Sequence, residues 1–216
     1  MSQLSEQELL ARIRRGDLSA LGDRLRAEQG RLFGICLRML GNRDDAAEAT
    51  QETMLKVVEH IRSFRGESGL GTWMVRIAMN QATSRLRVRA RRSTLSLEQA
   101  SSNGKAGGDD QASGLREQIC DSREPSPSHS VQRDEQRQIL HDALLKLDEP
   151  FRAVLVLRDL GQMDYQQIAQ SLQLSVGTVK SRLFRARLAL RKVLQEYERT
   201  TESAIPESDR PEVNAR

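Results

Sequence analysis

Aromatic residues, cysteines and histidines are all scarce in this chain. Only 3% of its 216 residues are Phe, Trp or Tyr, so any site built on ring stacking must use very few side chains. The two cysteines, Cys36 and Cys120, lie far apart in the sequence and have no metal-ligand spacing. We interpret both as structural; a redox role for Cys120 is the less favoured alternative, because only Arg123 is near enough in sequence to activate its thiol. No metal or cofactor is predicted.

Catalytic motifs are also missing from the sequence. The three histidines, His60, His129 and His141, fall in unrelated contexts, and none is part of an H-E-x-x-H pair. The chain has no phosphate-binding loop and no G-x-S-x-G elbow. We therefore expect a protein that is not an enzyme, and a nuclease is the weakest of the alternatives considered.

Long apolar runs are lacking as well. No stretch approaches the roughly 20 apolar residues that a membrane-spanning helix needs. The first residues, MSQLSEQELLARIRRGD, contain no apolar segment of the kind found in secretory signals. We expect a cytoplasmic protein without membrane insertion.

The sequence does contain abundant helical periodicity in two blocks. Residues 1–92 repeat apolar positions at three- and four-residue spacing and are broken at Gly16, at Gly41 and at 66–71, which predicts about four helices. The same period returns over 134–198, again with four expected helices. Both blocks are net basic, and neither contains a stretch that alternates like a strand.

Two polar, net acidic segments lie outside these blocks. Residues 93–133 are rich in Ser, Gly and Pro and keep no apolar period, so we interpret them as a flexible linker. Residues 199–216 are polar and contain two prolines, which predicts a disordered tail. The sequence thus predicts an all-α protein of two small helical domains joined by a flexible linker.

The second domain ends in a predicted helix-turn-helix. Asp164 is a candidate N-cap, with Gln167 three positions later to complete a capping box, so 165–172 is predicted as a short helix. Gln173 falls in the turn. Ser175 is a second candidate N-cap, and from Val176 an apolar stripe indicates one buried face, formed by Val179, Leu183, Ala186, Leu190 and Val193.

The helix from Val176 is strongly basic. Residues 165–195 contain six basic side chains and no Asp or Glu, whereas a helix that is merely solvated usually mixes the two signs. The alternative is an ordinary surface helix. The agreement between the fold pattern and the charge pattern favours DNA binding.

Four motifs in the two domains resemble one family. DAAEATQETMLKV from Asp45 and TWMVRIAMN from Thr72 resemble D-A-E-D-L-V-Q-E and T-W-L-x-R-I-A-x-N, and YQQIA from Tyr165 and VGTVKSRLFRAR from Val176 resemble a helix-turn-helix. All four are similar to motifs of the extracytoplasmic-function (ECF) sigma factors of the bacterial sigma-70 class. The chain departs from the family at Ala49, Met54 and Val58, where bulkier residues are common, and at Gln173, where Gly is common.

The resemblance implies a function and partners. It implies an alternative-type sigma factor that binds bacterial RNA polymerase core and directs promoter-specific initiation at -10 and -35 elements of promoter DNA. A dedicated anti-sigma factor is implied as a further partner. The alternative is a helix-turn-helix regulator that acts without being a polymerase subunit, but residues 1–92 have no pattern typical of a sensory domain.

The resemblance also implies three sets of site residues. The polymerase-binding set is Asp45, Gln51, Glu52 and Leu55. The set for the -10 element is Phe64, Trp73, Arg76, Asn80, Arg85, Arg87 and Arg89. The set for the -35 element is Thr178, Lys180, Ser181, Arg182, Phe184, Arg185 and Arg187. Two other interpretations stay open: Trp73 could belong to the core, and acids near the start of the 45–61 helix could serve its dipole.

Overall fold

The computed structural model describes residues 6–66, 68–102 and 127–204, and every regular element in them is helical. The elements are α1 (Glu6–Arg14), α2 (Leu18–Leu40), α3 (Arg43–His60), the 3₁₀ turn η1 (Ile61–Ser63), α4 (Leu70–Ser102), α5 (Pro127–Leu145), α6 (Glu149–Asp159), α7 (Tyr165–Leu172) and α8 (Val176–Ala204). The predicted all-α fold class is confirmed over these residues. No described helix is long and apolar enough to cross a membrane.

Local caps explain where the helices of the first domain begin and end. Asp17 caps α2 by accepting a hydrogen bond from the Ala20 amide, and Gly41 ends the same helix in the left-handed region, at φ 85°. Asn42 then caps α3 through the Asp45 amide. The breaks predicted at Gly16 and Gly41 are therefore real turns, because each combines a side-chain cap with a positive-φ glycine.

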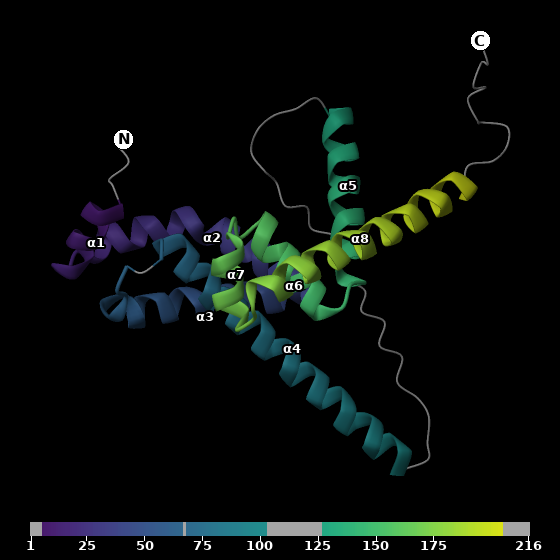
Figure 1. Ribbon diagram of the computed structural model, residues 1–216, viewed down its shortest axis with the longest axis horizontal. Helices are drawn as coiled ribbons and strands as arrows, with labels where there is room; N and C mark the ends of the chain where they lie inside the picture. Colours follow the sequence, from purple (N-terminus) through teal and green to yellow (C-terminus); the bar gives the residue numbers. More distant parts are fainter. Residues whose placement is uncertain (1–5, 67, 103–126, 205–216) are drawn as a thin grey trace.

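Helices α2, α3 and α4 form the core of the first domain. Their inward faces bury large apolar side chains completely, among them Leu21, Leu32, Ile35, Met39, Leu70 and Met74. Only the first half of α4 takes part in this core. Among the residues of α4 up to Arg92, whose burial the structure describes, Ala82 is the last that is fully buried and every residue from Arg87 to Arg92 is exposed. The helix projects away from the body (Figure 1).

The second domain packs α6, α7 and α8 around Leu157, Met163, Ile168 and Val179, with α5 against α8. The predicted helix-turn-helix is confirmed in detail. Asp164 and Gln167 form the reciprocal capping box, α7 spans Tyr165–Leu172, and Gln173 ends it at φ 54° in the left-handed region. Ser175 caps α8 by accepting from the Thr178 amide at 3.0 Å.

Three helices extend further than the sequence predicts. Helix α4 continues to Ser102 and α5 begins at Pro127, so both ends of the predicted linker 93–133 are helical. Likewise α8 continues to Ala204, six residues into the predicted tail. Residues 93–102 contain neither Gly nor Pro, and an existing helix gains one hydrogen bond with each added residue, so it continues through Ser-rich sequence. Residues 103–126 and 205–216 lie outside the described part of the chain.

The two domains are in contact. In Figure 1 the second domain lies beside the end of α2, and α2 packs against both α5 and α6. This contact fixes the orientation of the helix-turn-helix relative to the first domain.

Candidate nucleic-acid interface

The start of α8 presents a polar and basic face to solvent. Val179, Leu183 and Ala186 are buried against α6 and α7, as the apolar stripe predicts. The side chains between them therefore point outward: Lys180, Ser181, Arg185 and Arg187 are exposed, while Thr178 and Arg182 are half-buried. Phe184 is 72% exposed, which is unusual for a ring in a soluble helix.

Three hydroxyl groups at the start of α8 are already engaged locally. The Thr178 and Ser175 hydroxyls lie 2.8 Å apart, and the Ser181 hydroxyl donates to the Thr178 carbonyl at 3.0 Å. These bonds order the first turn of α8. None of these bonds involves the other expected -35 residues, of which Lys180, Phe184, Arg185 and Arg187 are exposed and Arg182 is half-buried.

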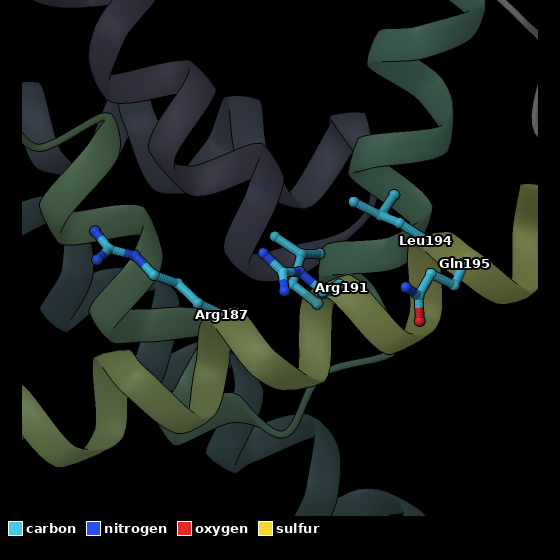
Figure 2. Close-up of a pocket in the computed structure, with 5 residues that line it drawn as sticks. Arg187, Arg191, Leu194 and Gln195 are labelled. Atoms are coloured by element: carbon cyan, nitrogen blue, oxygen red, sulfur yellow. The ribbon is translucent and has the colours of Figure 1, made fainter.

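The basic face continues along α8 beyond the predicted set. Arg187, Leu190, Arg191, Leu194 and Gln195 line a shallow cavity of about 430 Å³. Figure 2 shows the guanidinium groups of Arg187 and Arg191 extending to the same side of α8, with Leu194 directed toward α5. The motif-based prediction did not include Arg191, although its spacing of four from Arg187 indicates a shared helix face.

The arginines of α4 fall into two environments. Arg87 and Arg89 lie on the exposed half of the helix, together with Arg91 and Arg92. Arg85 is half-buried and forms ion pairs of 2.8 Å with both Glu48 and Glu52 of α3. The projecting half of α4 is therefore strongly basic, whereas Arg85 is held at its base.

Arg85 belongs to a polar network that joins α3 to α4. Gln81 donates to Glu52 at 3.0 Å and accepts from Lys56 at 3.0 Å. The hydrogen bond and ion pair with Glu48 raise the pKa of Arg85, and the same guanidinium lowers the pKa of Glu48. Arg85 was expected to bind DNA and Glu52 to bind polymerase, but in the structure these two side chains form an ion pair with each other.

Phe64 and Trp73, the two aromatic residues of the expected -10 set, pack together. Their ring centroids are 5.0 Å apart with the planes tilted by 39°. Phe64 is only 7% exposed and belongs to the core, so it is not available to stack on a base. Trp73 is half-buried, as is Arg76, while Asn80 is exposed.

A groove between α2 and α3 lies close to the expected polymerase-binding residues. It has a volume of about 630 Å³, and its lining includes Gln29 and Phe33 of α2 and Gln51 and Met54 of α3. The polymerase-binding residues implied by the motifs all lie in α3. The sequence does not single out Phe33 of α2, because it fits the apolar period of the core, although the structure shows it only half-buried.

The four expected polymerase-binding residues differ in availability. Gln51 lines the groove, and Leu55 beside it is 56% exposed. Asp45 accepts from the Asn42 side-chain amide at 2.6 Å within the α3 cap, which fits the alternative of an acid that serves the helix start. Glu52 is held by Arg85. The departure at Ala49 does not alter this surface, because Ala49 is fully buried.

Neither Cys36 nor the acidic residues that the structure describes add a chemical site. Burial raises the pKa of the Cys36 thiol to about 11, so this cysteine is unreactive and structural, while Cys120 lies outside the described residues. No group of three potential metal ligands occurs within the ranges that the structure describes.

Comparison with known proteins assigns both domains to the sigma-70 family. Residues 25–92 match sigma-70 region 2, and residues 137–190 match sigma-70 region 4. The chain is 33% identical over 195 residues to the RNA polymerase sigma-H factor of Pseudomonas aeruginosa, covering 90% of this chain and 96% of that protein. It is 32% identical over 195 residues to the ECF RNA polymerase sigma-E factor of Escherichia coli K12, covering 89% and 96%.

Solved structures share the fold. The sigma factor RpoE in complex with the anti-sigma factor NepR, from Bartonella quintana, has a TM-score of 0.60 at 20% identity, covering 81% of this chain and 96% of that one. CnrH in complex with the cytosolic domain of CnrY has a TM-score of 0.58 at 19% identity, covering 88% and 97%. With the region 2 and region 4 matches and the identity to curated relatives over most of its length, this chain belongs to the ECF group of RNA polymerase sigma factors in the sigma-70 family.

Proposed function

We propose that this sigma factor uses three separate surfaces, one for polymerase core and one for each promoter element. As a sigma factor it is a non-enzymatic initiation factor that works with RNA polymerase core and promoter DNA. What is proposed is the assignment of its own residues to those partners.

The -35 element is read by the exposed face of α8. A helix fits the major groove, where Arg can donate two hydrogen bonds to guanine and an apolar group can touch the thymine methyl. Lys180, Phe184 and Arg185 have the exposure for base contacts. Arg182 and Arg187 lie to the sides of them and contact phosphates, together with Arg191.

The -10 element is held by α4. Holding opened bases costs a few kcal/mol per unstacked step, and aromatic platforms are the usual compensation. Of the two aromatic residues expected at the -10 element, Phe64 is buried and Trp73 is half-buried. We therefore expect Asn80 and the arginines of the projecting half of α4 to supply most of the binding. We expect weak melting power and dependence on a well-matched promoter.

Polymerase core docks at the groove between α2 and α3. Gln51 and Leu55 keep their expected role, and Gln29, Phe33 and Met54 join them as groove-lining residues. Leu55 at 56% exposure and Val58 at 47% make an apolar patch next to the groove, as interface cores commonly have.

An anti-sigma factor is a further proposed partner, supported by a protein of the same fold, the sigma factor RpoE, that was solved in complex with the anti-sigma factor NepR. Because promoter DNA and polymerase occupy the bacterial cytoplasm, we place the protein there.

One observation supports the proposal most strongly: residues 176–195 of α8 carry six basic side chains and no acid, and the ring of Phe184 is exposed among them. The test is run-off transcription with purified core polymerase on a promoter library randomised at both elements. We expect enrichment of one pair of elements over core alone. If no sequence is enriched, the proposed function is wrong.

Arg185→Ala sharpens the same experiment. Loss of a base contact should cost about 1 to 3 kcal/mol at the preferred site and relax sequence choice at one position. Arg187→Ala is the matched control, because loss of a phosphate contact should weaken all sequences alike. An equal loss on every sequence for Arg185→Ala would move that residue to the phosphate set.

A further inference from the structure

The first backbone amide of α4 is capped from another helix. The Leu70 N–H donates to Oε1 of Glu6, which lies in the first turn of α1, 64 positions earlier in the chain. The first amides of a helix have no partner within it, and the residue that precedes the helix commonly supplies a side-chain acceptor. Here that residue is Gly69, which has no side chain. Glu6 therefore fills, from α1, a role that Gly69 cannot fill.

The other two helices of the same core are capped locally. Asp17 caps α2 and Asn42 caps α3, each from the position directly before its helix. At α4 the corresponding space is taken by the carboxylate of α1, because Oε2 of Glu6 lies 3.6 Å from the place that a Cβ on Gly69 would occupy. The start of α4 thus depends on a contact with α1.

The sequence of α1 directs Glu6 toward this place. Leu9, Leu10 and Ile13 follow Glu6 at spacings of three, four and seven, so the four residues share one face of α1. Ile13 is buried in the core, and Leu9 and Leu10 pack against it. Docking of this apolar face therefore carries the Glu6 carboxylate to the start of α4.

Helix α2 contacts the same turn of α4 but does not replace the cap. A Cβ on Gly71 would lie 3.3 Å from Nη2 of Arg24 and 3.4 Å from Oε1 of Glu28, so the two helices approach closely here. A guanidinium has no acceptor atom, and Oε1 of Glu28 is already paired with Arg24 at 2.6 Å. Glu6 is the acceptor that the structure gives to the Leu70 amide.

The capped turn carries Trp73. Its amide donates to the Gly69 carbonyl at 3.0 Å, which is the first hydrogen bond of the α4 ladder, and its ring centroid lies 5.0 Å from that of Phe64. A helix without its cap frays first at such a terminal bond. Asn80 lies about two turns further into the helix. Loss of the cap should therefore displace Trp73 and leave Asn80 in place.

We propose that Glu6 is a positioning residue for recognition of the -10 element. By capping α4 from α1, it holds the half-buried ring of Trp73 where this helix meets promoter DNA, and it acts through the helix rather than by touching DNA. The inference rests on the proposed role of α4 at the -10 element. Because the capped turn belongs to the first domain, reading of the -35 element by α8 does not depend on it.

The first measurement is the fluorescence of Trp73, the single tryptophan of the chain. In the free full chain, Glu6→Ala should shift the emission to longer wavelength, because a frayed turn exposes the ring to water. Glu6→Gln keeps an acceptor oxygen and should preserve the parent emission. Gln7→Ala is the matched control, since Gln7 is exposed in the same turn of α1. Unchanged emission in Glu6→Ala, or an equal shift in Glu6→Gln, would exclude the cap.

A cap restored on α4 itself tests the same role from the other side. Apart from its chain neighbours, the nearest described atom to a Cβ at position 69 is Oε2 of Glu6 at 3.6 Å, so a side chain fits there. Gly69→Ser supplies an ordinary N-cap hydroxyl. Added to Glu6→Ala, it should return the emission to that of the parent. A double variant that is folded by circular dichroism but keeps the shifted emission would contradict the proposal.

The second measurement is selection by the complex with core polymerase from the promoter library randomised at both elements. Glu6→Ala should reduce enrichment of the preferred -10 bases by up to about fivefold, the factor equivalent to about 1 kcal/mol for a lost N-cap, and leave enrichment at -35 unchanged. A smaller folded fraction lowers the yield from every promoter alike and cancels in the ratio of the two enrichments.

The two possible failures are distinguishable in this selection. An equal fall at both elements, or no fall at either, would exclude Glu6 as a positioning residue for the -10 element. A parent protein that enriches no -10 sequence would instead contradict the proposed function, whatever the fluorescence of the variants.

Discussion

Arg85 and Arg87 stand two positions apart on α4 and have opposite surroundings. Arg85 is enclosed by two carboxylates of α3, whereas Arg87 is exposed on the projecting half of the helix. A guanidinium that already has two carboxylate partners gains little from a phosphate. We therefore expect Arg85 to connect the helices and Arg87 to bind DNA.

This difference predicts distinct effects for two alanine variants. Arg87→Ala should weaken promoter binding by the holoenzyme on all sequences and reduce the slope of log affinity against log salt by about 1. Arg85→Ala should leave that slope unchanged and lower the free energy of unfolding by about 1 kcal/mol, because its carboxylate partners are partly exposed. Salt titrations and urea unfolding measure the two effects. An equal loss of slope in Arg85→Ala would return it to the DNA-binding set.

The sequence could not distinguish these arginines. Which of them meets an acid depends on how α3 lies against α4, and Glu48 is 37 positions away from Arg85. The same limit applies to Phe64, whose burial against Trp73 depends on the turn between α3 and α4. A motif identifies the residue type needed at a surface, but packing decides which residues reach that surface.

At the scale of elements, the helix-turn-helix was predictable because its signals are local. A capping box needs residues only three positions apart, and Asp164 and Gln167 form it as predicted. Local conformation also explains why glycine is common in the family at position 173. Gln173 adopts φ 54° and ψ 47°, a left-handed conformation that glycine reaches without strain. The ends of α4 and α8 were predicted too early, near 92 and 198, because composition was weighed over helix-breaking residues; Gly104 and Pro206 stand only two positions beyond Ser102 and Ala204.

Gln173→Gly should stabilise the protein. Removing Cβ relieves left-handed strain on the order of 1 kcal/mol, so the free energy of unfolding in urea should rise by up to about that amount. Gln170→Gly is the control: it is exposed inside α7, where glycine should cost about 1 kcal/mol. Unchanged or lower stability in Gln173→Gly would mean that the turn carries no strain.

At the scale of the whole molecule, the contact between the domains was invisible in the sequence. Arg31 and Leu160 are 129 positions apart, and the acceptor is a backbone carbonyl that every residue has. Two helical domains and their order could be predicted from periodicity and composition. Their mutual orientation could not, because no sequence pattern marks an arginine as a cap for a distant helix.

The domain contact should weaken in mild acid. His141 of α5 is half-buried at this contact, and burial lowers its pKa below the ordinary value. A hydrogen bond with the Gly41 backbone and the charge of Asp142 oppose this shift, and the charges of Arg38 and Arg152 add smaller effects in the lowering direction. A histidine held neutral in the folded state stabilises fully above its ordinary pKa, and this stabilisation is lost as pH falls from there toward the lowered value.

We therefore expect the free energy of unfolding to fall as pH is lowered from 7 to about 5.5, in a window set by the ordinary histidine pKa. His141→Gln should flatten this dependence. The carboxylates with lowered pKa, Asp17 and Glu48, lose their contributions only below about 4.5, so they do not obscure the window. A His141→Gln variant with an unchanged pH profile would exclude this histidine as the cause.

Helix α4 is continuous from the core of the first domain to Ser102, and this has a consequence for promoter DNA. From the fully buried Ala82 to the exposed Arg92 it rises about 15 Å without a break, turning about 100° per residue. One inserted residue would rotate every later arginine by that angle, so the continuous helix fixes the directions of these arginines relative to the core of the first domain. Because α4 has no break at which it could bend, we expect mismatches in groove width or phosphate spacing to be absorbed by deformation of the DNA.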